Sequence, residues 1–187
     1  MGSLVTLAHS QIREVLLPGT RAIDCTAGNG HDTVFLSHCV GTNGGVLSID
    51  IQQEALSKTR SLCSQEGLSN VIFVQDSHEQ LSKIVQQHSF ETPRCIVFNL
   101  GFLPRSESSL TTKSESSCRA IEQALAITQS GGIISILAYR GHCGGAEEER
   151  AVRDLLEGLP QRSFAVQRHG VRNERDDTPV LWMVRVL

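Results

Sequence analysis

The stretch DCTAGNGHDT (residues 24–33) joins two apolar runs and has the composition of a ligand-binding turn. Gly28 and Gly30 carry no side chain, so the backbone around them can approach a ligand closely. Two further acids end apolar runs, Asp50 in GVLSID and Asp76 in VIFVQD. A carboxylate at Asp50 can accept both hydroxyls of a ribose, and one at Asp76 can receive an adenine amino group. These residues predict a site for an adenosine-containing cofactor.

Two cofactors of this kind compete. A dinucleotide such as NAD is typically bound by a GxGxxG turn, whereas this turn reads GNGHDT, with Thr33 where the third small residue belongs. Asp32, at the start of the expected helix, also suits a pyrophosphate poorly. S-adenosylmethionine carries a positive sulfonium and an ammonium group, which the acids Asp24 and Asp32 suit. The sequence therefore favours S-adenosylmethionine over NAD, and a purely structural glycine loop is the third alternative.

A fourth apolar run leads to Asn99 in IVFNLGFLP (96–104). Amine-methylating enzymes of the class I methyltransferase fold often place an asparagine and a proline or aromatic residue at this point. The asparagine oxygen can accept a hydrogen bond from the target amine, and Leu103 and Pro104 can pack against the base. We therefore expect Asn99 beside the methyl group to be transferred. The alternative is that Asn99 only caps the turn.

Two later segments supply candidates for substrate binding. YRGHCGG (139–145) offers Tyr139 for stacking on a base, Arg140 for a phosphate and His142 for accepting a proton. RHGVRNERDDTP (168–179) contains Arg172 and two further arginines, at 168 and 175, that could meet RNA. A solvated hairpin and an exposed histidine are the simpler readings of the same residues.

Apolar runs alternate with helical patterns, which predicts right-handed βαβ crossovers and a mostly parallel sheet covered on both faces. Because ligands bind beyond the carboxyl ends of such strands, the candidate residues should meet at one edge. We expect one Rossmann-like α/β domain over 1–187, a class I methyltransferase fold with a seven-stranded sheet, an antiparallel last strand and an N-terminal helical cap over 1–18. The expected strands are 21–25, 44–51, 70–76, 94–100, 131–139, 163–169 and 179–187, and the expected helices are 4–16, 32–40, 53–67, 78–88, 113–128 and 146–159.

Composition sets further bounds. The net charge of −3 argues against a strongly basic nucleic-acid binder but allows a local basic patch. Six cysteines without a CxxC pair fit reduced thiols better than a disulfide framework or a metal site, so we expect no metal. No apolar run has the length of a membrane span. We expect an intracellular protein, either cytoplasmic or, if a transit peptide has been removed, in a plastid or mitochondrion.

Five motifs occur together and in order: DCTAGNGHDTVFL, SIDIQ with Ala55 and Thr59 behind it, DSHE, FNLGFLP and AYRGHCGGAEEE. Over residues 20–187 the chain resembles the tRNA 5-(aminomethyl)-2-thiouridine methyltransferase family, which is also labelled the rRNA methylase family. The resemblance implies methylation of the aminomethyl nitrogen of the wobble uridine to the 5-methylaminomethyl form. The chain departs from the pattern of the family at Phe102, where tyrosine is common, and at Cys143 inside the glycine-rich turn.

The resemblance also implies which residues bind the cofactor and which partner the protein meets. The methionine end would be held by Asp24, Gly28, Asn29, Gly30, Asp32 and Thr33, the ribose by Asp50 and Gln52, the adenine by Asp76 and His78, and the methyl group would lie beside Asn99. The partner would be the anticodon stem-loop of tRNA, with homodimer formation left open. Three alternatives stand: methylation of another amine on rRNA, protein or a small molecule, an NAD-dependent enzyme, and a non-catalytic RNA-binding relative.

Overall fold

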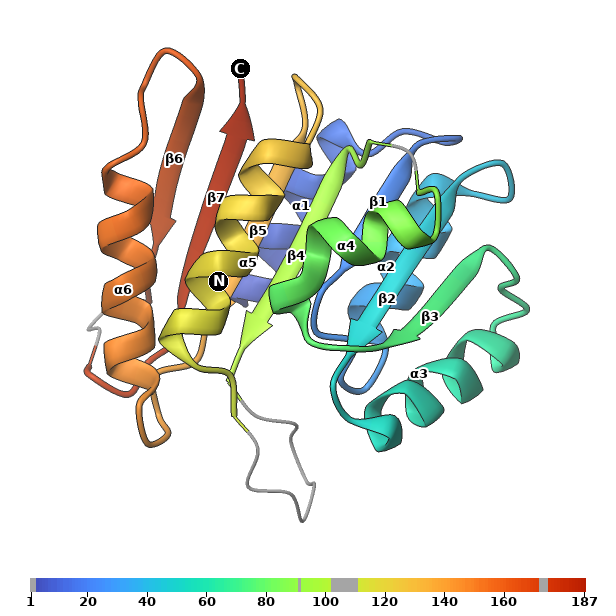
Figure 1. Cartoon of the computed structure of the whole chain (residues 1–187), viewed down its shortest axis with the longest axis horizontal. Coiled ribbons are helices and arrows are strands. Elements are labelled where there is room, and N and C mark those ends of the chain that lie inside the picture. The colour runs from blue at the N-terminus through green and yellow to red at the C-terminus, as the bar shows by residue number, and fades with distance from the viewer. Residues whose placement is uncertain (1–2, 91, 102–110, 172–174) are drawn as a thin grey trace.

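The computed structural model describes residues 3–90, 92–101, 111–171 and 175–187, and it shows one seven-stranded sheet (Figure 1). The strand order is β3-β2-β1-β4-β5-β7-β6. Neighbouring strands from β3 to β5 pair in parallel, and β7 pairs antiparallel with both β5 and β6. The strands are β1 (Arg21–Asp24), β2 (Gly45–Asp50), β3 (Val71–Gln75), β4 (Cys95–Leu100), β5 (Ile133–Ala138), β6 (Phe164–His169) and β7 (Val180–Val186). The predicted fold class and its antiparallel last strand are confirmed.

Helices cover both faces of the sheet (Figure 1). One face packs against α1 and α2, and the other packs against α4, α5 and α6. The helix α3 lies beside α2, β2 and β3. The helices are α1 (Leu4–Val15), α2 (His31–Val40), α3 (Gln53–Gln65), α4 (Leu81–Gln87), α5 (Ser114–Ile127) and α6 (Gly145–Glu157), and a short 3-10 turn, η1 (His78–Gln80), precedes α4. The expected helix over 78–88 therefore begins as a 3-10 turn, whose N-cap is Ser77.

Alternation along the strands decides which face each side chain joins. In β4, Ile96 and Phe98 are buried against the α4–α6 face, whereas Val97 is buried against the α1–α2 face. Because side chains alternate with a period of two, Asn99 belongs to the face covered by α1 and α2. The same rule places Asp24, two residues after the buried Ala22, on that face. Two predicted site residues therefore share one side of the sheet.

The sequence over 146–159 has the pattern of a solvated amphipathic helix, yet Glu148 and Glu149 in the first two turns of α6 are buried. The cysteines lie mostly in apolar segments, which predicts core residues, but Cys143 is exposed. Among the described residues, no helix is long and apolar enough to cross a membrane.

A buried polar cluster lies beneath the glycine loop, where β1 meets α2. The carboxyl group of Asp24, fully buried, accepts hydrogen bonds from the backbone N–H of Thr26 (3.1 Å) and the hydroxyl of Thr33 (2.6 Å). The Thr33 hydroxyl also lies 2.9 Å from that of Ser48 in β2. These contacts tie the end of β1 to the first turn of α2 and to the neighbouring strand.

A close approach of α3 completes the support of the loop. Gly30 has φ +87°, and a Cβ added there would lie 2.8 Å from the Cα of Thr59 in α3. The position therefore requires glycine both for its left-handed backbone and for its packing. The loop is held from below by Asp24 and from the side by α3.

Burial and the charge of Asp32 raise the pKa of Asp24 from 3.8 to about 7, while hydrogen bonds from Thr33 and Thr26 oppose the rise. The folded protein thus keeps the proton of Asp24 up to about pH 7, whereas the unfolded chain loses it near pH 4. Because the folded state binds more protons in this window, Asp24 makes stability fall as the pH rises from about 4 to about 7.

We predict that Asp24→Asn flattens this dependence. The amide cannot ionise, its oxygen can accept from the Thr26 N–H, and its NH₂ can donate to the Thr33 hydroxyl oxygen. The difference in unfolding free energy between variant and wild type should therefore shift in favour of the variant from pH 4.5 to pH 8, by on the order of a few kcal/mol. Urea denaturation at the two pH values measures the difference. Asp154→Asn, at an exposed acid of α6, is the matched control and should show no such gain. Parallel pH profiles for wild type and Asp24→Asn would contradict the assignment.

Candidate functional site

A cleft of about 430 Å³ opens at the carboxyl ends of the parallel strands. Its described lining residues come from the ends of β2 and β4, from the segments that follow the five strands β1 to β5, and from the first turns of α1, α2 and α5. Eight residues predicted from the sequence line it: Gly28, Asn29, Asp32, Asp50, Gln52, His78, Asn99 and Tyr139. The structure brings these eight residues together at one edge of the sheet, and their individual roles remain predictions.

Asp50 lies at the end of β2 with both oxygens anchored by backbone. One oxygen accepts from the N–H of Gly28 (3.0 Å) and the other from the N–H of Gln52 (2.9 Å). Burial raises the pKa of Asp50, and these backbone donors partly counter that rise. Each carboxylate oxygen has a further lone pair, so the group can still accept a pair of ligand hydroxyls.

Asp32, in the first turn of α2, is the point where three elements meet. Its Oδ1 lies 2.5 Å from Nε2 of His9 in α1, and its Oδ2 accepts from Nδ2 of Asn99 in β4 at 2.7 Å. The ring of His9 stacks on Phe35, with 3.7 Å between ring centroids. Sequence reasoning missed His9, because nothing in the pattern of α1 marks one of its residues as a partner of Asp32.

The bond to Asp32 decides which way the Asn99 amide faces. Only its NH₂ group can donate to a carboxylate, so the carbonyl oxygen Oδ1 is directed away from Asp32. The backbone N–H of Asn99 donates to the Thr26 hydroxyl at 2.7 Å, which fixes the residue from a second side. Burial alone would raise the pKa of Asp32, but the hydrogen bonds from His9 and Asn99 leave it below its usual value. Asp32 is therefore a carboxylate fixed by two hydrogen bonds, and the carbonyl oxygen of Asn99 is a neutral hydrogen-bond acceptor.

The structure corrects the roles predicted for Asp24, Gly30 and Thr33. The side chains of Asp24 and Thr33 are fully buried and bonded to one another beneath the loop, so neither lines the cleft. A side chain at Gly30 would meet Thr59 of α3. All three residues support the loop that carries the lining residues, and none of them is itself a lining residue of the cleft.

At the predicted adenine end of the site, Ser77 lines the cleft in place of Asp76. The carboxylate of Asp76 accepts from the N–H of Ser77 at 2.7 Å and does not line the cleft, whereas Ser77 and His78 do. Burial lowers the pKa of His78, against the opposing effect of a backbone contact with Cys25. Its Nε2 is buried without a hydrogen-bond partner among the described residues. His78 is therefore a neutral, polar group at the wall where an adenine would lie.

Arg140 is turned away from the cleft, which corrects its predicted role as a phosphate ligand. Its guanidinium donates to the carbonyl oxygens of Thr178 (2.7 Å) and Arg175 (2.6 Å), and it lies 4.0 Å from the buried Glu149. The guanidinium group of Arg140 is therefore bound within the protein. It links the segment before β7 to α6.

His142 lies behind the wall of the cleft rather than in its lining. Its Nδ1 is 3.1 Å from the carbonyl oxygen of Cys143, and its Nε2 is 3.7 Å from where a Cβ of Gly101 would lie. Gly101 itself lines the cleft, so a small ligand group would have to pass it to meet the imidazole. Leu103, Pro104, Phe102 and Arg172, also singled out in the sequence, lie outside the described residues.

A buried acid of α6, Glu148, supports the part of the cleft wall that contains Thr112. Glu148 accepts from the hydroxyls of Thr112 (2.7 Å) and Ser117 (2.6 Å), and the Thr112 N–H donates to the carbonyl oxygen of Gly101. Thr112 lines the cleft. From the sequence, a glutamate in an amphipathic helix is expected to be exposed to solvent. The buried position of Glu148 is therefore known only from its tertiary contacts.

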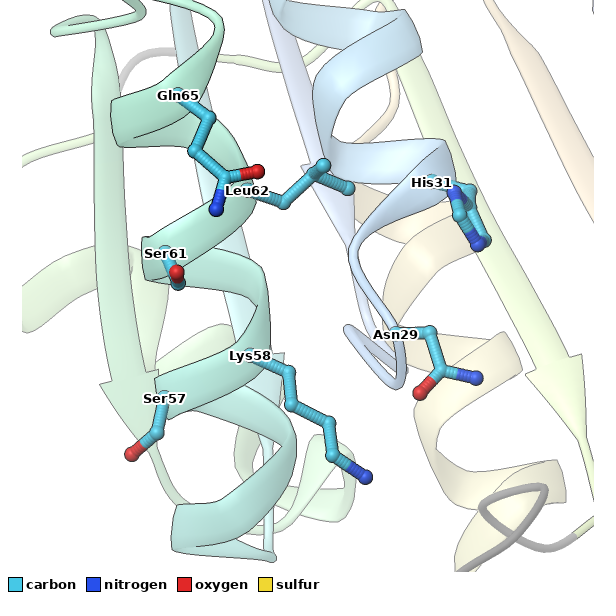
Figure 2. A pocket seen from close by; sticks show the side chains of 7 residues that line it. All are labelled: Asn29, His31, Ser57, Lys58, Ser61, Leu62 and Gln65. Atoms are coloured by element: carbon cyan, nitrogen blue, oxygen red, sulfur yellow. The ribbon is translucent and has the colours of Figure 1, made fainter.

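A wider groove of about 920 Å³ lies outside the cleft, between α3 and the start of α2 (Figure 2). Its walls are mostly polar side chains of α3, with Lys58 near the loop residue Asn29. Lys58 is paired with Glu54 at 2.7 Å. Among the predicted site residues that the structure describes, Asn29 alone lines this groove, so the predicted residues gather in the cleft and not in the larger groove.

The charge of the cleft lining restricts its ligand. The described lining residues include the carboxylates Asp32 and Asp50 but neither lysine nor arginine. A pyrophosphate would find no cationic partner there, whereas a sulfonium or ammonium group would find two anions. The donor set therefore fits S-adenosylmethionine better than a dinucleotide.

Comparison with known proteins gives the same assignment. The model of the family described as "Putative rRNA methylase" matches residues 46–185, and a model of protein-L-isoaspartate O-methyltransferases matches residues 3–80. The Arabidopsis thaliana protein named "tRNA (mnm(5)s(2)U34)-methyltransferase, chloroplastic" is 35% identical over 163 residues, which are 82% of this chain and 59% of the relative. The chain thus spans less than two thirds of that relative.

Two solved structures cover the whole of this chain and 99% of their own. A "putative rRNA-methylase" from Clostridium thermocellum has a TM-score of 0.94 at 31% identity. A "putative methyltransferase" from Streptococcus mutans, solved in complex with SAH, has a TM-score of 0.89 at 34% identity. With its sheet order, its cleft and the family match over 46–185, the chain belongs to the rRNA methylase family of S-adenosylmethionine-dependent methyltransferases.

Proposed function

We propose that the protein is an S-adenosylmethionine-dependent tRNA methyltransferase that methylates the amine of 5-aminomethyl-2-thiouridine at the wobble position. The product is the 5-methylaminomethyl form. The observation that carries the proposal is a cleft with two carboxylates, no lysine or arginine among its described lining residues, and the amide of Asn99 hydrogen-bonded to one of those carboxylates. The name of the Arabidopsis relative supports this substrate.

The cleft residues would divide among three parts of the cofactor. Asp50 and Gln52 would hold the ribose, Ser77 and His78 would flank the adenine, and Gly28 and Asp32 would receive the methionine end. The anionic lining and the neutral His78 suit this ligand. When bound, S-adenosylmethionine supplies the methyl group of the reaction.

Asn99 would position the amine. In the transfer, the lone pair of the nitrogen forms the new N–C bond while the S–C bond breaks and its electron pair stays on sulfur. The amine must therefore be neutral and must point its lone pair at the methyl carbon. Because Nδ2 of Asn99 is bound to Asp32, its Oδ1 is the atom that can accept an N–H of the amine and fix this geometry.

An aminomethyl group is largely protonated near neutral pH, so one proton must leave before the transfer. His142 is our candidate acceptor, because a neutral imidazole can take up a proton on a ring nitrogen. It lies behind Gly101, so its contact with the amine depends on how the substrate enters past that residue. Water is the alternative acceptor.

The partner that we propose is the anticodon stem-loop of tRNA. Since Arg140 is bound within the protein, phosphate contacts must come from other residues. The chloroplastic label of the Arabidopsis relative is consistent with a location in an organelle. Methylation of rRNA is the second candidate, and the name of the rRNA methylase family favours it.

Asp50→Ala should weaken the binding of S-adenosylhomocysteine by about tenfold or more, because the ribose loses its charged acceptor. Isothermal titration calorimetry measures the change. Asp76→Ala is the matched control: its carboxylate is bonded to Ser77 outside the cleft, so it should retain most of the affinity. Unchanged affinity in Asp50→Ala, or binding of NADH in place of S-adenosylhomocysteine, would refute the cofactor site.

Asn99→Ala should lower the single-turnover rate of methyl transfer by about 100-fold, with S-adenosylhomocysteine affinity little changed. Asn43→Ala, at an exposed asparagine before β2, is the control and should react normally.

His142→Ala should lower the single-turnover rate by less than Asn99→Ala does. Its rate deficit should shrink at higher pH, because the amine then deprotonates without an acceptor from the protein. If the loss in His142→Ala is independent of pH, that residue positions substrate and does not accept the proton.

The substrate is tested on modified RNA. The purified protein, given S-adenosylmethionine and an anticodon stem-loop that carries 5-aminomethyl-2-thiouridine, should yield the 5-methylaminomethyl nucleoside by mass spectrometry. Cells lacking the protein should accumulate the unmethylated nucleoside at the wobble position. Normal wobble nucleosides in those cells, together with a methyl group missing from rRNA, would replace this function with the second candidate.

A further inference from the structure

The N-terminal helix α1 contributes a polar contact to the cleft residue Asp32. His9 points its Nε2 at Oδ1 of Asp32, at 2.5 Å, and its side chain retains 23% exposure. Its ring lies nearly parallel to that of Phe35, at an angle of 4°. The guanidinium of Arg13, one helical turn further on, lies 5.1 Å from the centre of the same phenyl ring. Phe35 therefore holds the imidazole in one orientation.

Asp32 can orient Asn99 only if its own carboxylate is fixed. A carboxylate bound at one oxygen can rotate about its Cβ–Cγ bond and carry the other oxygen out of hydrogen-bond range. Here the two oxygens are bound by donors from elements far apart in the chain, His9 from α1 and Asn99 from β4. The plane of the carboxylate is therefore set jointly by the two donors.

We propose that His9 is a positioning residue for methyl transfer: by holding Asp32 it fixes the Asn99 amide, whose carbonyl oxygen receives the substrate amine. The proposal rests on the proposed function for the identity of that amine. The contact His9–Asp32–Asn99 itself does not depend on which amine is methylated.

Two substitutions separate the hydrogen bond of His9 from its stacking. His9→Gln places an amide NH₂ near the position of Nε2 and loses the ring, whereas His9→Phe keeps a ring on Phe35 and loses the donor. If the donor matters, His9→Gln should react at close to the wild-type rate. His9→Phe should then lose about tenfold or more in the single-turnover rate.

The NMR signals of the Asn99 side-chain amide provide a readout that does not require turnover. They are assigned in ¹⁵N-labelled protein by their loss in Asn99→Ala. In His9→Gln the Asn99 NH₂ signals should remain close to their wild-type shifts, and in His9→Phe they should move as the hydrogen bond to Asp32 weakens. His38→Ala, at a half-exposed histidine near the far end of α2, is the control for both readouts and should change neither.

The outcomes are distinct. If His9→Phe reacts normally and His9→Gln is impaired, the stacking matters and the proposal is wrong. If the Asn99 signals stay unchanged in His9→Phe, His9 does not position Asn99, whatever the rate. If wild-type protein transfers no methyl group to the aminomethyl uridine, the proposed function fails, while the NMR comparison still decides the role of His9.

Discussion

The carboxyl group of Asp24 beneath the glycine loop fixes where the site can form. It joins the end of β1 to the first turn of α2 through Thr26 and Thr33, and the Thr33 hydroxyl reaches Ser48 in β2. A buried carboxyl without such partners would be strongly destabilising, so the cluster persists only when strand and helix keep this spacing. The loop above it, and with it the position of Asp32, follows from that spacing.

Sheet geometry brings the second half of the site to the same place. Asp24 pairs with Val97 across β1 and β4, and Asn99 stands two residues further toward the carboxyl edge, on the same face. The amide of Asn99 therefore emerges where α2 begins, within reach of Asp32. One parallel pairing and one buried cluster are enough to place an acid and an amide side by side, although 67 residues separate them.

Much of this arrangement could be predicted from the sequence, because strand ends and glycine turns are local signals. The alternation of apolar runs located every strand, and the fold class then brought Asp50 and Asn99 to one edge. What could not be predicted depends on tertiary contacts. Asp24 and Asp32 have the same local character, and only packing buries the first and exposes the second to the cleft. Glu148 similarly looks solvated until Thr112 and Ser117 are seen beside it.

The charges of the cleft also bear on the order of events in the proposed reaction. Asp32 and Asp50 attract a cationic ligand, but the same field favours the protonated form of a substrate amine, which cannot react. A sulfonium bound beside these carboxylates would offset their charge and would make loss of the amine proton easier. The neutral Oδ1 of Asn99 can orient the amine without adding a further negative charge. In the proposed reaction the amine would therefore become reactive more readily in a cleft already loaded with cofactor, and the carboxylates would repel the phosphates of an RNA substrate.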